Sequence, residues 1–275
     1  MSRIERQFQQ CRQAGRTALI PYITGGDPEP AATVGLMETL VESGADVIEV
    51  GIPFSDPMAD GPVIQAACER ALAHDVNITR LLEMVREFRQ RNHDTPVVLM
   101  GYLNPIEQMG YERFAREAAA AGVDGVLTVD LPPEESHDLV QALTAHELDP
   151  IWLVAPTTRR ERLEAICGVA RGFIYYVSLK GVTGADTLNV DDVAHHVEDI
   201  RAASQLPVGV GFGIRDAETA ARVGAVADAV VVGSAVVKRI AENSNDPAAM
   251  RDALRELIGG MRRALDAEAA GVDSR

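Results

Sequence analysis

The residues best suited to chemistry lie in one stretch of fourteen residues, Ile48–Gly61. Glu49 interrupts an apolar run over residues 46–50 that predicts a β-strand. Burying an unpaired ionised carboxylate costs several kcal/mol, so strand interiors normally exclude one. The loop that follows carries further acids, Asp56 and Asp60. A carboxylate at the end of a buried strand, next to an acidic loop, is typical of an active site on an α/β scaffold. The alternative is a salt-bridged Glu49 beside ordinary turn residues.

The charge of the chain limits the classes of partner. Lys and Arg number 26 against 41 Asp and Glu, which gives a formal net charge of −15. Such a surface repels nucleic acid and anionic lipid, so neither is an expected partner. It also repels an anionic substrate at long range. A phosphate site in this chain must therefore depend on local dipoles and backbone N–H groups.

Cysteine usage and hydropathy indicate a soluble cytoplasmic protein. Cys11, Cys68 and Cys167 show neither a CxxC motif nor a His/Cys spacing, so we expect reduced thiols and no metal site. No apolar stretch reaches membrane-spanning length, and residues 1–6 do not lead into a signal-peptide core.

The elements that must position Glu49 alternate regularly along the chain. Apolar runs predict strands at residues 17–23, 46–50, 96–100, 125–129, 151–154, 173–177, 207–210 and 228–232. Helices are predicted at 2–14, 30–43, 62–73, 78–91, 106–121, from 130–135 onward, 158–168, 191–203, 216–223, 234–240 and 247–268, with Asp27 as a candidate helix cap.

The fold expected from these elements is a closed (β/α)8 TIM barrel. The strand runs are continuously apolar, which indicates parallel strands covered on both faces. Eight βα units then form a single domain over residues 1–275, with an extra N-terminal helix and a short phosphate-binding helix. An open doubly wound sheet is disfavoured, because no GxGxxG follows the first strand.

Function in such a barrel lies at the C-terminal ends of the strands. The residues at these ends are mostly apolar or aromatic: Tyr22, Glu49, Met100, Tyr102, Leu127, Leu153, Tyr175, Phe212 and Val232. We expect Asp60, on the loop after the second strand, to lie above this ring. An apolar pocket raises a carboxyl pKa, which equips the acid to donate as well as accept a proton. The ring favours a flat apolar ligand, although each apolar residue alone is more often core than pocket.

The last two strands end in glycines that indicate a phosphate site. Gly213 and Gly233 leave room for backbone amides to approach a ligand. Ser234 opens a short helix whose N-terminal amides attract an anion, and loops in these positions form the usual phosphate site of the barrel. The loop at 180–186 is a candidate lid that adds the Gly184 amide. Lys180 is an alternative Schiff-base lysine, but its loop is polar.

These motifs together resemble the tryptophan synthase alpha subunit family over nearly the whole chain. The stretch Ile48–Gly61 resembles the family signature, and residues 24–28, 181–184, 211–214 and 233–238 match in order and spacing. The resemblance implies a (β/α)8 barrel that cleaves indole-3-glycerol phosphate to indole and glyceraldehyde 3-phosphate by a retro-aldol reaction. It also implies no cofactor in this chain and a beta partner subunit in an α2β2 heterotetramer, which holds pyridoxal phosphate and receives indole through a tunnel.

The same resemblance implies a role for each site residue. Glu49 is the proton donor to the indole ring carbon, and Asp60 stabilises positive charge at the indole N–H. The implied substrate-binding residues are Tyr22, Met100, Tyr102, Leu127, Tyr175, Thr183 and Phe212. The implied phosphate-binding residues are Gly184, Gly213, Gly233 and Ser234. Many relatives have Phe where this chain has Tyr22, so the added hydroxyl needs a partner or water.

Two other functions remain open from the sequence. One is a different phosphate-binding barrel, such as an isomerase or an indole-glycerol-phosphate synthase; the synthase needs a catalytic lysine at a strand end, and none of the apolar runs contains one. The other is a catalytically idle barrel that only binds and activates the beta subunit. The presence of both Glu49 and Asp60 argues against the idle barrel.

Overall fold

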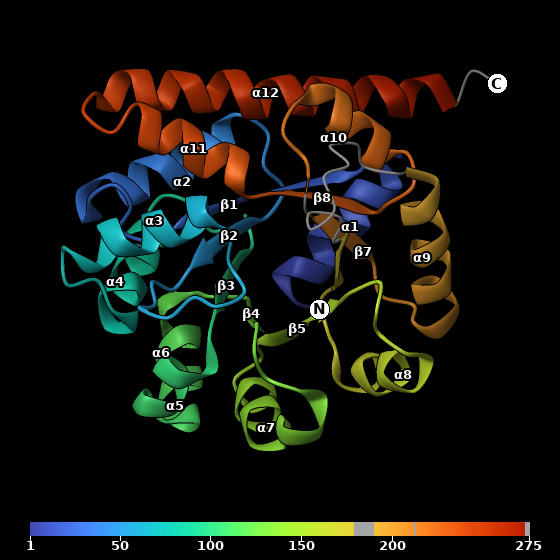
Figure 1. The fold of residues 1–275 in the computed structure, drawn as a ribbon, viewed down its shortest axis with the longest axis horizontal. Coiled ribbons are helices and arrows are strands. Elements are labelled where there is room, and N and C mark those ends of the chain that lie inside the picture. The colour runs from blue at the N-terminus through green and yellow to red at the C-terminus, as the bar shows by residue number, and fades with distance from the viewer. Residues whose placement is uncertain (179–189, 212, 273–275) are drawn as a thin grey trace.

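The chain forms a closed barrel of eight parallel strands in the order β1 to β8, with β8 paired to β1 (Figure 1). The computed structural model describes residues 1–178, 190–211 and 213–272, with 269–272 described by backbone alone. The strands are β1 (Ala18–Thr24), β2 (Ile48–Gly51), β3 (Val97–Gly101), β4 (Gly125–Thr128), β5 (Asp149–Val154), β6 (Ile174–Val177), β7 (Val208–Gly211) and β8 (Ala229–Val232). The expected (β/α)8 barrel is confirmed, and closure by the β1–β8 pair excludes the open sheet.

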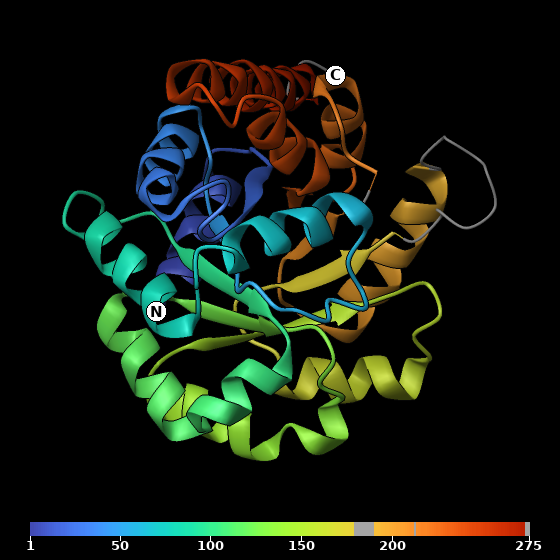
Figure 2. The ribbon, with the colours of Figure 1, turned by 60° about the vertical axis from the view of Figure 1, so that its left-hand side comes forward.

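Helices surround this barrel on its outer face, except for the first helix, which covers one end. They are α1 (Arg3–Gln13), α2 (Thr33–Glu42), α3 (Pro62–Leu72), α4 (Ile78–Arg89), α5 (Leu103–Met109), α6 (Tyr111–Ala121), α7 (His137–Ala145), α8 (Arg160–Val169), α9 (Val190–Ala203), α10 (Ala217–Gly224), α11 (Ser234–Glu242) and α12 (Pro247–Val272), with 3-10 turns η1 (Pro30–Ala32) and η2 (Pro133–Glu135). The long α12 runs along the outside against α10 and α11 in both views (Figures 1 and 2). No described helix combines the length and apolar character that crossing a bilayer requires.

Three of the helix predictions differ from the structure. The helix expected at 106–121 is two helices, because Gly110 adopts φ 86° between α5 and α6. The helix expected to open at 130–135 begins as η2 and continues as α7. Asp27 does not cap a helix: its fully buried carboxylate accepts two hydrogen bonds from Arg70, at 2.6 and 3.0 Å.

Strand residues alternate between the barrel interior and the helix layer. Residues such as Ile20, Val98 and Leu127 form an interior cluster together with Phe8 of α1, whose ring centroid lies 5.6 Å from that of Phe173. Their strand neighbours, such as Leu99, pack instead in the cluster beneath the helices. This period of two decides which strand-end residues can face a site, and α1 closes the end of the barrel away from the C-terminal strand ends.

Aspartates at the N-terminal strand ends are fully engaged with cations and backbone amides. Asp124 accepts from Arg3 at 2.8 Å, from Arg89 at 2.7 Å and from the Val97 amide at 2.8 Å. Asp46 and Asp228 repeat the arrangement, each accepting from a strand amide and from arginine. These contacts tie helices and neighbouring strands together at one end of the barrel.

Candidate active site

Glu49 lies on β2, with its side chain directed into the barrel beside Tyr22 of β1 and Val98 of β3, which are its register partners. Only 1% of the residue is exposed. Burial, followed by the nearby charge of Asp60, raises the pKa of Glu49 to about 8. Among the described residues, Glu49 Oε1 has no hydrogen-bond partner. The acid is therefore protonated at neutral pH and has a free oxygen with which to meet a ligand.

Asp60 is held at the rim by Tyr102. The Tyr102 hydroxyl donates to Asp60 Oδ2 at 2.9 Å and accepts from the Ala59 amide at 3.0 Å. Burial raises the pKa of Asp60, and the hydrogen bond from Tyr102 opposes that rise. The ring of Phe54 lies against the Tyr102 ring, with centroids 5.3 Å apart. The structure thus places Tyr102 in direct contact with an acid, a relation that its position after a strand did not reveal.

Two buried tyrosines fit against glycines on neighbouring strands. A Cβ at Gly51 would overlap the Tyr22 hydroxyl, and a Cβ at Gly211 would overlap the Tyr175 hydroxyl. The Tyr22 hydroxyl has Thr24 Oγ1 as its partner at 3.2 Å, as the extra hydroxyl requires. Burial raises the pKa of Tyr175 well above its usual value, and the charges of Glu49 and Asp60 raise it further. Both phenols therefore stay neutral beside the two acids.

The apolar strand-end residues divide between the two faces of the barrel. Met100, Leu127 and Leu153 belong to the interior cluster, as expected from the sequence. Val232 was expected on the same ring, but it packs among the helices, while its neighbour Val231 faces the interior. The prediction for Val232 was wrong because the last residue of a strand can face either way.

The predicted phosphate residues lie at the ends of β7 and β8. Gly213 adopts φ 75°, a conformation that favours glycine. Gly233 is the N-cap residue of α11, and Ser234 is the exposed first residue of that helix. The first amides of a helix have no partner within it and attract anions. A Cβ at Gly233 would meet Tyr22 Cβ at 3.9 Å, an ordinary van der Waals contact, so the described protein atoms leave room for one there.

The remaining predicted residues fall at two places in the sequence. Thr183, Gly184, Phe212 and Lys180 lie outside the described residues. Sequence reasoning missed Gln65 of α3, which contacts the backbone of the Asp60 loop. Its signal was available, because residue 65 falls in the first turns of the helix predicted immediately after Asp60. No group of three or more His, Cys, Asp or Glu in the described ranges is arranged to hold a metal ion.

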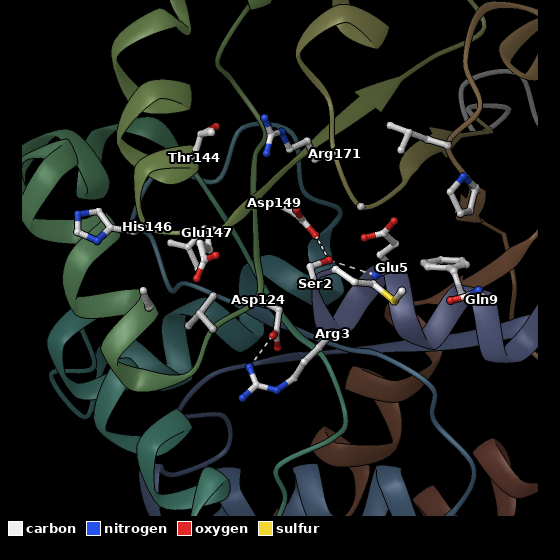
Figure 3. A pocket seen from close by; sticks show the side chains of 18 of the residues that line it. Ser2, Arg3, Glu5, Gln9, Asp124, Thr144, His146, Glu147, Asp149 and Arg171 are labelled. Atoms are coloured by element: carbon white, nitrogen blue, oxygen red, sulfur yellow. Dashed lines mark hydrogen bonds and ion pairs between the residues drawn. The ribbon is translucent and has the colours of Figure 1, made fainter.

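A cavity of about 1040 Å³ lies at the opposite end of the barrel, beside α1 (Figure 3). Two of its acids are engaged: Asp149 accepts from Ser2 at 2.6 Å and Asp124 pairs with Arg3. Glu5 and Glu147 also line the cavity, but both are exposed to solvent. The C-terminal strand ends instead hold a proton-donating carboxyl in apolar surroundings. The arrangement there suits proton transfer to a flat, apolar, phosphorylated molecule.

Comparisons with known proteins identify related sequences and structures that cover nearly the whole chain. A family model described as "Tryptophan synthase alpha chain" matches residues 8–266. The chain is 64% identical over 266 residues to the tryptophan synthase alpha chain of Thioalkalivibrio sulfidiphilus, covering 97% of this chain and all of that one. It is equally identical over 274 residues to the alpha chain of Alkalilimnicola ehrlichii, covering both chains completely. The crystal structure of tryptophan synthase subunit alpha from Legionella pneumophila superposes with a TM-score of 0.91 at 47% identity, covering 97% of this chain and 99% of that one.

Proposed function

The chain belongs to the tryptophan synthase alpha chain family, lyases that cleave indole-3-glycerol phosphate in tryptophan biosynthesis, and we propose that Glu49 and Asp60 carry out the cleavage in this protein. The observation that carries the proposal is the state of Glu49, which is 1% exposed and has a pKa of about 8 at a strand end. An acid in this state can donate a proton at neutral pH and then accept one.

The reaction requires a proton at the ring carbon that bears the glycerol chain. Neutral Glu49 donates that proton, and positive charge develops at the ring nitrogen. The Asp60 carboxylate stabilises this charge, with its own orientation set by the Tyr102 hydroxyl. Loss of the proton from the adjacent glycerol hydroxyl then breaks the carbon–carbon bond, releasing the aldehyde and restoring the aromatic ring. The Glu49 carboxylate left by the first step is a suitable base in the same pocket.

We assign one group of residues to each end of the substrate, the indole ring and the phosphate. Tyr22, Met100, Tyr102, Leu127 and Tyr175 are proposed to enclose the indole ring, together with Thr183 and Phe212. The glycines Gly184, Gly213 and Gly233, with Ser234, are proposed to bind the phosphate. Support for the second group comes from the N-terminus of α11 and from the room that the described protein atoms leave for a Cβ at Gly233.

We also propose that the chain acts as one domain over residues 1–275 with a beta partner subunit, in an α2β2 assembly whose pyridoxal phosphate belongs to the beta subunit. The name alpha chain carried by the relatives supports a partner. The Pro132–Pro133 turn is a candidate contact, and so is the first turn of α5, which contains Asn104 and Pro105. A cytoplasmic location accords with the free cysteines Cys11, Cys68 and Cys167.

The experiment that tests the proposal is an assay of the purified chain alone with indole-3-glycerol phosphate. Slow formation of indole is expected, since Asp60 lies on a largely exposed loop. Added beta subunit should then raise kcat about 10–100-fold by ordering the loops. No indole formation from this substrate, with or without the beta subunit, in a chain that still binds and activates beta, would support the idle barrel instead.

A further inference from the structure

The loop that carries Asp60 has little packing of its own. Residues 55–61 between β2 and α3 are all exposed or half-buried, and Met58 is 83% exposed. Hydrophobic contacts therefore cannot fix the direction in which the Asp60 side chain leaves the backbone. Hydrogen bonds from better-packed elements must do so. Tyr102 supplies one of them, to the Asp60 carboxylate.

Gln65 supplies a second hydrogen bond, to the backbone of Asp60. Its Nε2 donates to the Asp60 carbonyl at 2.8 Å and reaches the Pro57 carbonyl at 3.5 Å. The Asp60 amide donates to that same Pro57 carbonyl at 3.0 Å, closing a tight turn. One side-chain amide thus contacts the carbonyl groups of the first and last residues of the turn that ends in Asp60.

The helix that bears Gln65 is itself firmly attached to the barrel. Ile64 and Cys68 of α3 are buried in a cluster with Tyr22 and Val237. Further along the helix, Arg70 makes the two hydrogen bonds with the buried Asp27 described above. Because α3 is fixed at both of these points, the Gln65 amide is presented to the loop from a rigid support.

We infer that Gln65 is a positioning residue for Asp60. Its amide sets the Asp60 backbone so that the carboxylate meets the Tyr102 hydroxyl and faces the ring nitrogen of the substrate. Gln65 itself touches no reacting atom. The inference rests on the proposed role of Asp60, and it adds a residue that controls how well that role is performed.

The test is Gln65→Met, which keeps the length of the side chain and removes the donor. We expect kcat with indole-3-glycerol phosphate to fall about 3–10-fold, the effect of losing one net hydrogen bond. KM should stay within about twofold, since the phosphate residues lie on other strands. The acid limb of the pH profile should move upward, because a misplaced Asp60 loses part of the Tyr102 hydrogen bond that lowers its pKa.

Two further variants make the outcome decisive. Gln10→Met, at an exposed position on α1 at the other end of the barrel, should behave as wild type. Asp60→Asn tests the premise: if it turns over at the wild-type rate, the proposed function fails. If Asp60→Asn is impaired while Gln65→Met has wild-type kcat and pH profile, the inference alone is overturned. A fall in kcat accompanied by a matching fall in Tm or a matching rise in KM would also overturn it, since that pattern indicates a general structural role.

Discussion

The two ends of this barrel use carboxylates in opposite ways. At the N-terminal strand ends, Asp46, Asp124 and Asp228 each accept from a backbone amide and an arginine. At the C-terminal ends, neither Glu49 nor Asp60 has an ion pair in the described part of the chain, and burial raises the pKa of both. Paired acids stabilise the fold, whereas unpaired buried acids cost stability and are available to a ligand. Carboxylates are present at both ends, and whether they are paired distinguishes the structural end from the reactive end.

The largest expected effect comes from Glu49→Gln. The amide keeps the shape but cannot transfer the proton, so kcat should fall by at least about 10²–10⁴-fold, the range for loss of general acid–base catalysis. The folded state raises the pKa of Glu49 from 4.5 to about 8, so ionising it costs stability as the pH rises through that range. We therefore expect the variant to have a higher Tm than wild type at pH 8–9 but not near pH 4.

These two readouts are compared by steady-state assay and by thermal unfolding at both pH values. Turnover close to wild type in Glu49→Gln would remove the residue from the mechanism. A Tm difference that does not change with pH would show that Glu49 ionises as freely in the folded protein as in the unfolded one.

Asp124→Ala should show the reverse pattern. It removes the carboxylate that pairs with Arg89, whose side chain is 9% exposed, and leaves the Val97 amide without its acceptor. Removing one member of a buried pair typically costs about 3–5 kcal/mol. Denaturant unfolding should show this loss, with kcat per folded molecule unchanged. Asp94→Ala, at an exposed acid whose ion-pair distance is 3.8 Å, is the matched control and should cost little. Equal stability of the two variants would show that the paired acids at the N-terminal strand ends do not stabilise the fold.

Gly233→Asp should act on substrate affinity. The added carboxylate faces the proposed phosphate position at the N-terminus of α11, where the protein leaves space. A hydrogen bond to a charged group contributes about 1.5–3 kcal/mol, so KM should rise about 10–100-fold. Gly168→Asp, at an exposed glycine of α8, is the control. An unchanged KM in Gly233→Asp would place the anion elsewhere.

The smallest expected effect is a shift of the pH profile in Tyr102→Phe. The Tyr102 hydroxyl lowers the pKa of Asp60 against the effect of burial. Without it that pKa rises further, so Asp60 becomes protonated at a higher pH and the acid limb of kcat moves upward. Tyr111→Phe, at a tyrosine on the outer helix α6, should leave the profile unchanged. A profile identical to wild type in Tyr102→Phe would mean that Asp60 ionisation does not limit turnover.

Sequence patterns predicted the barrel because its strands are continuous apolar runs of the right length, and they located Glu49 because it breaks one of them. They could not give features that depend on three-dimensional contacts. Asp27 follows a strand as a cap residue would, but Arg70, distant in sequence, takes its carboxylate. Val232 and Val231 are alike in sequence, and only the strand register separates the interior face from the outer one.

The two acids also differed in how far the sequence could describe them. Glu49 needs only a strand and an apolar neighbourhood to be recognised. The position of Asp60 depends on hydrogen bonds from Tyr102 and Gln65, which come from two different helix starts. Loop geometry of this kind is set by tertiary contacts, so residue spacing alone does not reveal it.

The proposed cleavage depends above all on Glu49 being a neutral acid in the resting protein. A direct measurement is a ¹³C NMR titration of the glutamate carboxyl carbons, with the Glu49 signal assigned by its absence in Glu49→Gln. We expect that signal to titrate near pH 8, well above the ordinary glutamate value of 4.5. Titration of Glu49 near its ordinary value of 4.5 would contradict its role as the proton donor.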